Sequence, residues 1–262
     1  MNKKIHSLIK NHSEFLTLSG IFLLSFTLRS LYYFLTDRIS RDSSTYIDYA
    51  ELLYKSNWDW GIVYTEDLMN NIPPLLTAIM TTGIEIGIGA KTSGILFCMI
   101  CGSLLPLGVY FCSVNIFKKR IYAYFAALLV AFHHYFIRIS ADILRDAPYH
   151  CFFAFALASA ICAINTGKKY FWIFFGVLSG LGALTRKEGP ELLIIFFMWN
   201  IIVLIKNEQP FFERLVQILK DSVIVVSCFC LVTIPVWLFI RSTTDSMWML
   251  FPFMNKILEQ WQ

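Results

Sequence analysis

The chain has 262 residues, of which 57% are hydrophobic and only 15% are charged. Soluble domains carry about 25% charged residues, so this composition excludes an ordinary water-soluble domain and predicts a protein largely immersed in lipid. The formal net charge of +4 becomes informative only when the charges are assigned to the two sides of a membrane.

Stretches with few or no charges recur at about 17–25 residues, the length of a helix that crosses a bilayer. The first covers residues 15–36 and carries one charge, Arg29, near its far end, where a long side chain can reach the membrane surface. No small-x-small cleavage site follows the N-terminus, so we expect an uncleaved first helix. Six further stretches follow at 92–117, 121–137, 147–167, 170–185, 189–205 and 222–240. The fold class expected is an all-α polytopic membrane protein with about seven transmembrane helices.

The longest segment between predicted spans is 37–91, and its first half has the pattern of an amphipathic helix. One face of this helix would carry Tyr46, Tyr49, Ala50 and Leu53, and the other Asp48, Glu51 and Lys55. Asp42, Ser43 or Ser44 can cap its start, and Trp58 and Trp60 suit the level of the lipid headgroups. We therefore predict a helix on the membrane surface that fixes Asp42 at its N-terminal start.

The uncharged segment 68–84 is also long enough to span the membrane. Counting it as a span would place every later loop on the opposite side of the membrane. It includes Pro73 and Pro74, which are poor helix residues. If it does not span, the cytosolic segments are 1–14, 118–120, 168–169 and 206–221, and the outer ones are 37–91, 138–146, 186–191 and 241–262. The cytosolic set then holds 11 Lys and Arg in 35 residues, against 10 in 92 for the outer set. This asymmetry follows the positive-inside rule, so we expect a cytosolic N-terminus and a surface helix at 68–84.

Acidic residues are still more unevenly distributed, with 14 of the 18 Asp and Glu in the outer segments. Since acidic residues have little influence on orientation, this bias indicates that the outer face carries the function. Three outer segments place an acid beside a cation. The first is Arg41-Asp42. The second contains Arg138, Asp142, Arg145 and Tyr149, which have the spacing of one helix face, with Asp146 beside Arg145. The third is Arg186, Lys187 and Glu188.

Cations at a membrane surface suit a lipid-borne phosphate. A nearby carboxylate suits activation of a hydroxyl or amine, or a divalent ion that bridges to the phosphate. A single acid–cation pair at a helix end is more often a solvated anchor, but three such pairs on one face favour a site. Adjacent histidines such as His133 and His134 point about 100° apart on a helix, so no metal site is predicted there.

The order of the motifs resembles the membrane-spanning GT-C glycosyltransferases, in the branch of the dolichyl-phosphate-mannose protein mannosyltransferases and the aminoarabinose–lipid A transferases. The acidic D-x-x-x-Y motif after the first helix is matched by "RDSSTYIDYAELL", and a Pro-Pro-Leu element by "IPPLLTAIM". An acidic patch that opens the fourth helix is matched by "ISADILRDAPY", and a later motif by "GLGALTRKEG". The four motifs follow the family's order over residues 15–205.

The resemblance implies transfer of a sugar from a polyprenyl-phosphate donor to a glycan, lipid or protein acceptor on the extracytosolic face. Asp42 would be the first-loop catalytic acid, and Asp142 or Asp146 the second-loop acid. Arg41, Arg145, Arg186 and Lys187 are candidates to hold the donor phosphate, with Tyr46, Arg138 and Glu188 completing the site. Ser43 stands where some relatives carry a second acid. A divalent cation is compatible with this chemistry, and no other cofactor and no nucleic-acid partner are expected.

Most members of that family are longer, so residues 1–262 are expected to form one membrane domain that corresponds to the family's N-terminal part. Two alternatives stay open. One is a non-catalytic membrane partner or truncated paralogue, and the other is a small-solute transporter, which would place ionisable groups along a path through the membrane. The short loops favour a bacterial inner membrane.

Overall fold

The computed structural model describes residues 2–36, 39–63, 74–206 and 210–243, and the regular structure within these ranges is helical. The helices are α1 (Asn2–Thr36), α2 (Arg41–Lys55), α3 (Trp60–Val63), α4 (Pro74–Glu85), α5 (Ala90–Phe117), α6 (Arg120–Phe132), α7 (His134–Ser140), α8 (Asp146–Thr166), α9 (Tyr170–Thr185), α10 (Glu191–Lys206) and α11 (Phe211–Thr243). The prediction of an all-α membrane protein is confirmed.

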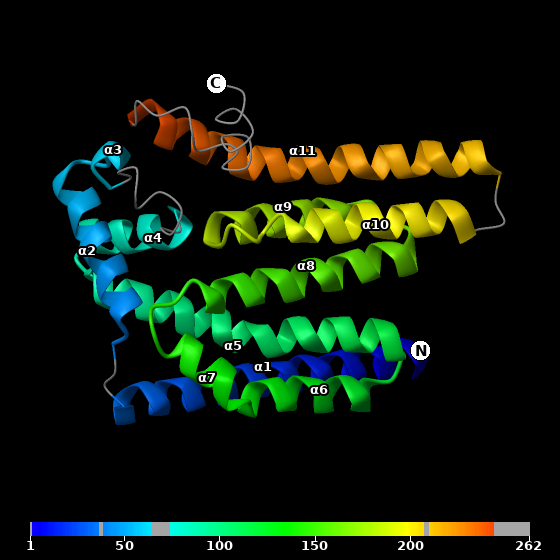
Figure 1. Cartoon of the computed structure of the whole chain (residues 1–262). Coiled ribbons are helices and arrows are strands. Elements are labelled where there is room, and N and C mark those ends of the chain that lie inside the picture. The colour runs from blue at the N-terminus through cyan, green and yellow to red at the C-terminus, as the bar shows by residue number, and fades with distance from the viewer. Residues whose placement is uncertain (1, 37–38, 64–73, 207–209, 244–262) are drawn as a thin grey trace, which may run out of the picture.

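The long helices lie side by side in a layered bundle, with α2 crossing one end of it (Figure 1). The main contacts follow the chain order: α5 packs on α1, α6 and α8, α8 packs on α9, and α9 packs on α11. The N-terminus and the α5–α6 and α8–α9 turns lie at the end opposite α2 (Figure 1). The predicted outer and cytosolic loops therefore gather at opposite ends, and we call the one with α2 the α2 end.

Four helical segments in the described ranges are long and apolar enough to cross a membrane, namely Ser13–Thr36, Ala90–Phe117, Asp146–Thr166 and Phe211–Ser242. The predicted span 121–137 is not one straight helix, because α6 and α7 are bent by 57° where they meet at His133. Counting this bent pair as one span gives five, and α9 and α10 are shorter apolar helices of 16 residues each. The total of seven spans stays a prediction.

Arg29 does not extend to the membrane surface as expected, because its side chain is fully buried against α5 and α7. Its Nη1 donates hydrogen bonds to the carbonyl oxygen of Ser25 at 3.0 Å and to Ser25 Oγ at 2.5 Å. Nε and Nη2 find no hydrogen-bond acceptor among the described residues. Gly102 of α5 leaves room for this side chain, because a Cβ added at Gly102 would lie 2.9 Å from Arg29 Nε.

The surface helix expected at 68–84 differs in extent and direction. Residues 68–73 lie outside the described residues, and α4 begins at Pro74, a residue well suited to the first turn of a helix. In Figure 1, α4 points along the bundle, whereas α2 crosses its end. Leu76, Thr77 and Met80 are fully buried against α2 and α5, so protein rather than lipid covers much of α4.

The packing at the α2 end fixes α2 in place. A hydrophobic cluster joins Tyr46 and Ala50 of α2 to Leu76 and Met80 of α4, and it extends to Ile143 in the turn before α8. Because a fully buried Leu, Ile or Met side chain contributes about 1.5–3 kcal/mol, α2 is anchored to two other segments of the chain.

We expect the Gly189→Ala variant to be destabilised, because Gly189 closes the tight turn between α9 and α10. A Cβ at this position would overlap the backbone of Ala183 and lie 2.6 Å from the carbonyl carbon of Gly182, and backbone cannot move aside as a flexible side chain can. Overpacking of this kind costs about 1–3 kcal/mol. Melting in detergent measures the effect, with Gly20→Ala in α1 as the control, since nothing lies within 4 Å of its added Cβ. Equal melting of both variants would contradict the prediction.

Candidate active site

Asp42 lies in the first turn of α2 and is exposed. The N-cap of the helix is Ser40, whose Oγ accepts the Ser43 N–H at 3.3 Å, so the expectation that Asp42, Ser43 or Ser44 caps it is wrong. The side chain that caps the helix is therefore that of Ser40 and not that of Asp42. Its negative charge is favourable at this position because the N-terminus of a helix carries partial positive charge.

The amphipathic pattern expected for α2 is confirmed. Of the predicted inward residues, Tyr46, Ala50 and Leu53 are buried and Tyr49 is half-buried, and Ser43 is buried one turn before Tyr46. The opposite face, with Asp48, Glu51 and Lys55, is exposed. Tyr46 thus points into the protein from the same helix that carries Asp42 on its exposed side.

Asp142 lies in a turn that links α7 to α8, not on a continuous helix. The expectation that Arg138, Asp142, Arg145 and Tyr149 share one helix face is therefore wrong, since α7 ends at Ser140 and α8 begins at Asp146. The break follows from Pro148, whose ring would collide with the carbonyl of Leu144 in a continuous helix. Asp142 Oδ1 accepts hydrogen bonds from Ser43 Oγ at 2.5 Å and from its neighbour, the Ile143 N–H, at 2.9 Å.

Arg186 binds two carboxylates from different segments. Its Nη1 pairs with Asp146 Oδ1 at 2.5 Å, and its Nε with Glu188 Oε2 at 3.1 Å. The guanidinium also lies over the ring of Tyr149, with Cζ 5.4 Å from the ring centroid. The start of α8 is thereby tied to the turn between α9 and α10.

Charges from three segments act on the buried phenol of Tyr46. Burial raises the pKa of Tyr46, Asp42 and Asp146 raise it further, and Arg145 and Arg186 lower it. The charge of Arg145 also acts on Glu188. We call this group, made of Asp42, Tyr46, Arg145, Asp146, Arg186 and Glu188, the Tyr46 cluster. The structure thus brings together six of the ten predicted site residues.

Arg41, Arg138 and Lys187 are exposed, and among the described residues no ion pair joins them to another side chain. Two residues with clear contacts in the site were not among the predicted ones. The sequence indicates Ser43 only as a possible helix cap and as the position where some relatives carry an acid, and Tyr149 only as part of a helix face. Their contacts with Asp142 and Arg186 depend on how distant segments meet, which no local sequence pattern indicates.

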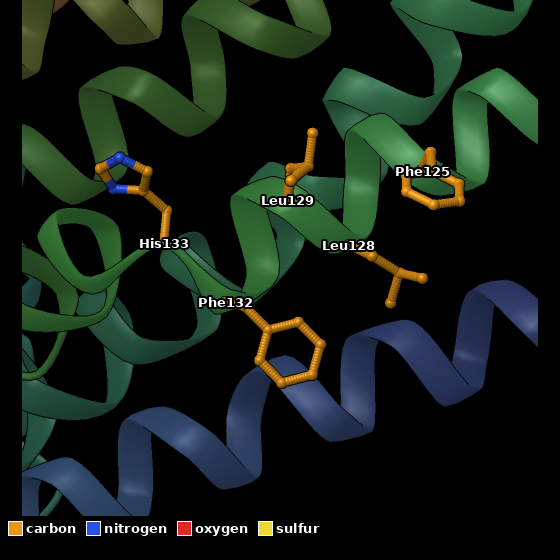
Figure 2. Close-up of a pocket in the computed structure, with 5 residues that line it drawn as sticks. All are labelled: Phe125, Leu128, Leu129, Phe132 and His133. Atoms are coloured by element: carbon orange, nitrogen blue, oxygen red, sulfur yellow. The ribbon is translucent and has the colours of Figure 1, made fainter.

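The described residues also form two shallow apolar grooves. One of about 310 Å³ is formed by Phe125, Leu128, Leu129, Phe132 and His133 of the α6 segment. In Figure 2, Phe132 and Leu128 point toward α1, whereas His133 points away from it. This groove contains none of the predicted site residues. The other, of about 300 Å³, lies between α3, α4, α9 and α11 and includes Trp60, Leu75 and Leu184, the last only two residues before Arg186.

A family model described as dolichyl-phosphate-mannose-protein mannosyltransferase matches residues 71–239 of the chain. The chain belongs to this mannosyltransferase family. It is therefore a membrane glycosyltransferase of the type that uses a polyprenyl-phosphate-linked sugar, in agreement with the resemblance seen in the motifs. No curated protein matches the chain.

The part that matches the mannosyltransferase family contains Asp142, Arg145, Asp146, Arg186 and Glu188, whereas Asp42 and Tyr46 precede it. The packing of α2 on α4 and α5 brings these two residues to the matched part. Within the described residues, no group of three or more His, Cys, Asp and Glu side chains is arranged to hold a metal ion.

The ion pair between Arg186 and Glu188 predicts a pH-dependent stability. The hydrogen bond from Arg186 holds the pKa of Glu188 below its ordinary value of 4.5. A lowered folded-state pKa adds stability that is fully present above the unfolded-state pKa and is lost as the pH falls through the folded value. We expect Glu188→Gln to melt below wild type at neutral pH, with the difference shrinking below about pH 4.5.

Melting curves of the two proteins across the acid range check this. Glu51→Gln is the control, since the pair of Glu51 and Lys55 is largely exposed and contributes little. A Glu188→Gln difference that stayed constant down to strongly acidic pH would mean that the charge of Glu188 does not stabilise the fold.

Proposed function

We propose that this chain transfers a sugar from a polyprenyl-phosphate donor to an acceptor at the extracytosolic face of the membrane, with Asp42 as the catalytic acid/base. The observation that carries the proposal is the Tyr46 cluster, which gathers acids and arginines from three segments at the α2 end of the bundle. That end is opposite the Lys- and Arg-rich turns at 118–120 and 168–169 (Figure 1), which suit a cytosolic face.

The chemistry of the transfer requires two kinds of group. The acceptor attacks the anomeric carbon of the sugar and loses a proton, and the bond from that carbon to the donor phosphate breaks with its electrons going to the phosphate. Asp42 is exposed and can take the proton of an approaching acceptor. Cationic side chains next to it stabilise the charge that develops on the leaving phosphate.

Arginines and a lysine around Asp42 are the proposed phosphate ligands. Arg145 belongs to the Tyr46 cluster. Arg41 is the residue before Asp42, and Lys187 lies between Arg186 and Glu188. Both of these side chains are exposed. Arg186 is already bound by Asp146 and Glu188, so we assign it chiefly to holding the site together. Of the two second-loop acids, Asp146 belongs to the cluster and Asp142 does not.

The apolar groove between α3, α4, α9 and α11 is the proposed path for the hydrocarbon chain of the donor. It is lined by Trp58, Trp60 and apolar side chains, and Leu184 places one end of it close to Arg186. A phosphate in the Tyr46 cluster would then have lipid-compatible surface beside it. The short loops favour a bacterial inner membrane, and the Lys- and Arg-rich turns at 118–120 and 168–169 favour a cytosolic N-terminus.

The experiment that tests the proposal uses the purified full chain in lipid vesicles with a radiolabelled polyprenyl-phosphate hexose. Release of the sugar to a membrane-extract acceptor or to water is followed over time, with protein-free vesicles as the blank. Release above the blank supports the enzyme. The absence of release, with the protein folded, would favour the non-catalytic partner or truncated paralogue.

A further inference from the structure

Ser43 joins the start of α2 to the turn between α7 and α8. Its side chain is fully buried, and its Oγ lies 2.5 Å from Asp142 Oδ1, 3.0 Å from the Ile143 carbonyl oxygen and 2.8 Å from Ser40 Oγ. A hydroxyl has a single hydrogen to donate, and a carboxylate is a stronger acceptor than a neutral oxygen. The Ser43 hydroxyl therefore donates to Asp142 and can accept from Ser40.

The hydrogen bonds that Asp142 accepts from the described residues all reach one oxygen. Oδ1 accepts from Ser43 Oγ at 2.5 Å, from the Ile143 N–H at 2.9 Å and, at a longer 3.4 Å, from the Ser40 N–H. Two of the three donors belong to the N-terminal turn of α2 and the third to the turn that contains Asp142. One carboxylate oxygen thus holds two segments that are about a hundred residues apart in the chain.

These contacts bear directly on Asp42 because it is the residue before Ser43. On the other side of the junction, Arg145 and Asp146 follow Asp142 by three and four residues. The hydrogen bond between Ser43 and Asp142 consequently fixes the distance from Asp42 to Arg145 and Asp146. A misplacement of about 1 Å in such a site can reduce the rate about 100-fold.

We propose that Ser43 and Asp142 form a positioning pair that sets Asp42 against Arg145 and Asp146, and that Asp142 is not the proton acceptor of the reaction. The inference rests on the proposed function, since the group that is positioned is the proposed catalytic Asp42. It assigns a specific task to the serine that stands where some relatives carry an acid, because an acid at position 43 would repel Asp142 whereas a hydroxyl binds it.

The amide and alanine variants of Asp142 separate positioning from proton transfer. Asp142→Asn keeps an oxygen that can accept from Ser43 but cannot serve as a base, whereas Asp142→Ala removes the acceptor. We expect Asp142→Ala and Ser43→Ala each to lower the transfer rate by about 10- to 100-fold, as befits a lost hydrogen bond to a charged group. Asp142→Asn should stay within about tenfold of wild type, and its pH–rate profile should keep its acid limb.

Two further variants complete the set. The double variant Ser43→Ala/Asp142→Ala should be no slower than the slower single variant, because both single changes break the same contact. Ser44→Ala is the matched control and should equal wild type, since Ser44 is exposed and its Oγ donates to the Arg41 carbonyl oxygen within its own helix. An Asp142→Asn variant as slow as Asp142→Ala, or one without the acid limb, would overturn the proposal, as would additive losses in the double variant.

Amide hydrogen exchange at the start of α2 provides a readout that does not need catalysis. Exchange of the residue 43–46 amides should accelerate in Ser43→Ala and Asp142→Ala but not in Asp142→Asn or Ser44→Ala. If wild type transfers no sugar while exchange follows this pattern, the pair is supported and only the proposed function fails. Unchanged exchange in both alanine variants would overturn the pair whatever the activity.

Discussion

The Asp42→Asn variant is expected to lose sugar transfer by about 10²- to 10⁴-fold, the usual contribution of a general acid or base. Asn keeps the size and polarity of the side chain but cannot take a proton from the acceptor. Asp42 is exposed, so the substitution should leave the fold intact. The only stability cost expected is that of removing a negative charge from a helix N-terminus, about 0.3–1 kcal/mol.

The measurement is the release of labelled hexose from the polyprenyl-phosphate donor, together with a melting curve for each protein. Asp48→Asn is the matched control, because Asp48 lies on the exposed face of the same helix and outside the Tyr46 cluster. It should transfer sugar like wild type. Equal transfer rates for Asp42→Asn and wild type would remove Asp42 from the mechanism and leave Asp146 as the acid to examine.

The Arg186→Ala variant is the second change with a large expected effect. Arg186 neutralises Asp146 and Glu188 and stacks on Tyr149. Its loss leaves two carboxylates without their common counter-charge and frees the start of α8 from the α9–α10 turn. We expect transfer to fall by about 100-fold or more, as for small displacements of catalytic groups, together with a lower melting temperature.

Lys at position 186 should not restore transfer, because a single ammonium cannot form two directed hydrogen bonds and stack on a ring in the way a planar guanidinium does. The double variant Arg186→Ala/Glu188→Gln removes one of the two uncompensated charges. It should regain part of the stability but not the transfer. Lys91→Ala, an exposed cation at the start of α5, is the control. Full transfer by Arg186→Lys would show that a positive charge alone suffices at this position.

Several features followed from the sequence alone because they depend on local composition and periodicity. Apolar length predicted helices that cross a membrane. The alternation of apolar and polar residues in α2 predicted an inward face with Tyr46, Tyr49, Ala50 and Leu53, of which all but the half-buried Tyr49 are buried. The family was recognisable from four short motifs that occur in the order typical of its members. The membership is confirmed by the match over residues 71–239.

Other features were decided only by the tertiary structure. Arg29 was expected at the membrane surface and is buried, because Gly102 on another helix leaves room for its side chain. The break between α7 and α8 could have been inferred from Pro148, but the consequence that Asp142 and Asp146 serve different partners could not. Asp142 binds Ser43 and Asp146 binds Arg186, across about 100 and 40 residues of chain.

The physical reason for this division is that a sequence pattern fixes which face of a helix is apolar, but not which helix covers it. Hydrophobic burial is not directional, so it orients α2 and α5 without selecting their partners. Hydrogen bonds and ion pairs require donors and acceptors about 3 Å apart, a condition met only after packing has set the helices. The sequence therefore determined a membrane glycosyltransferase with acids and cations on one face, and the tertiary structure decided which of them meet.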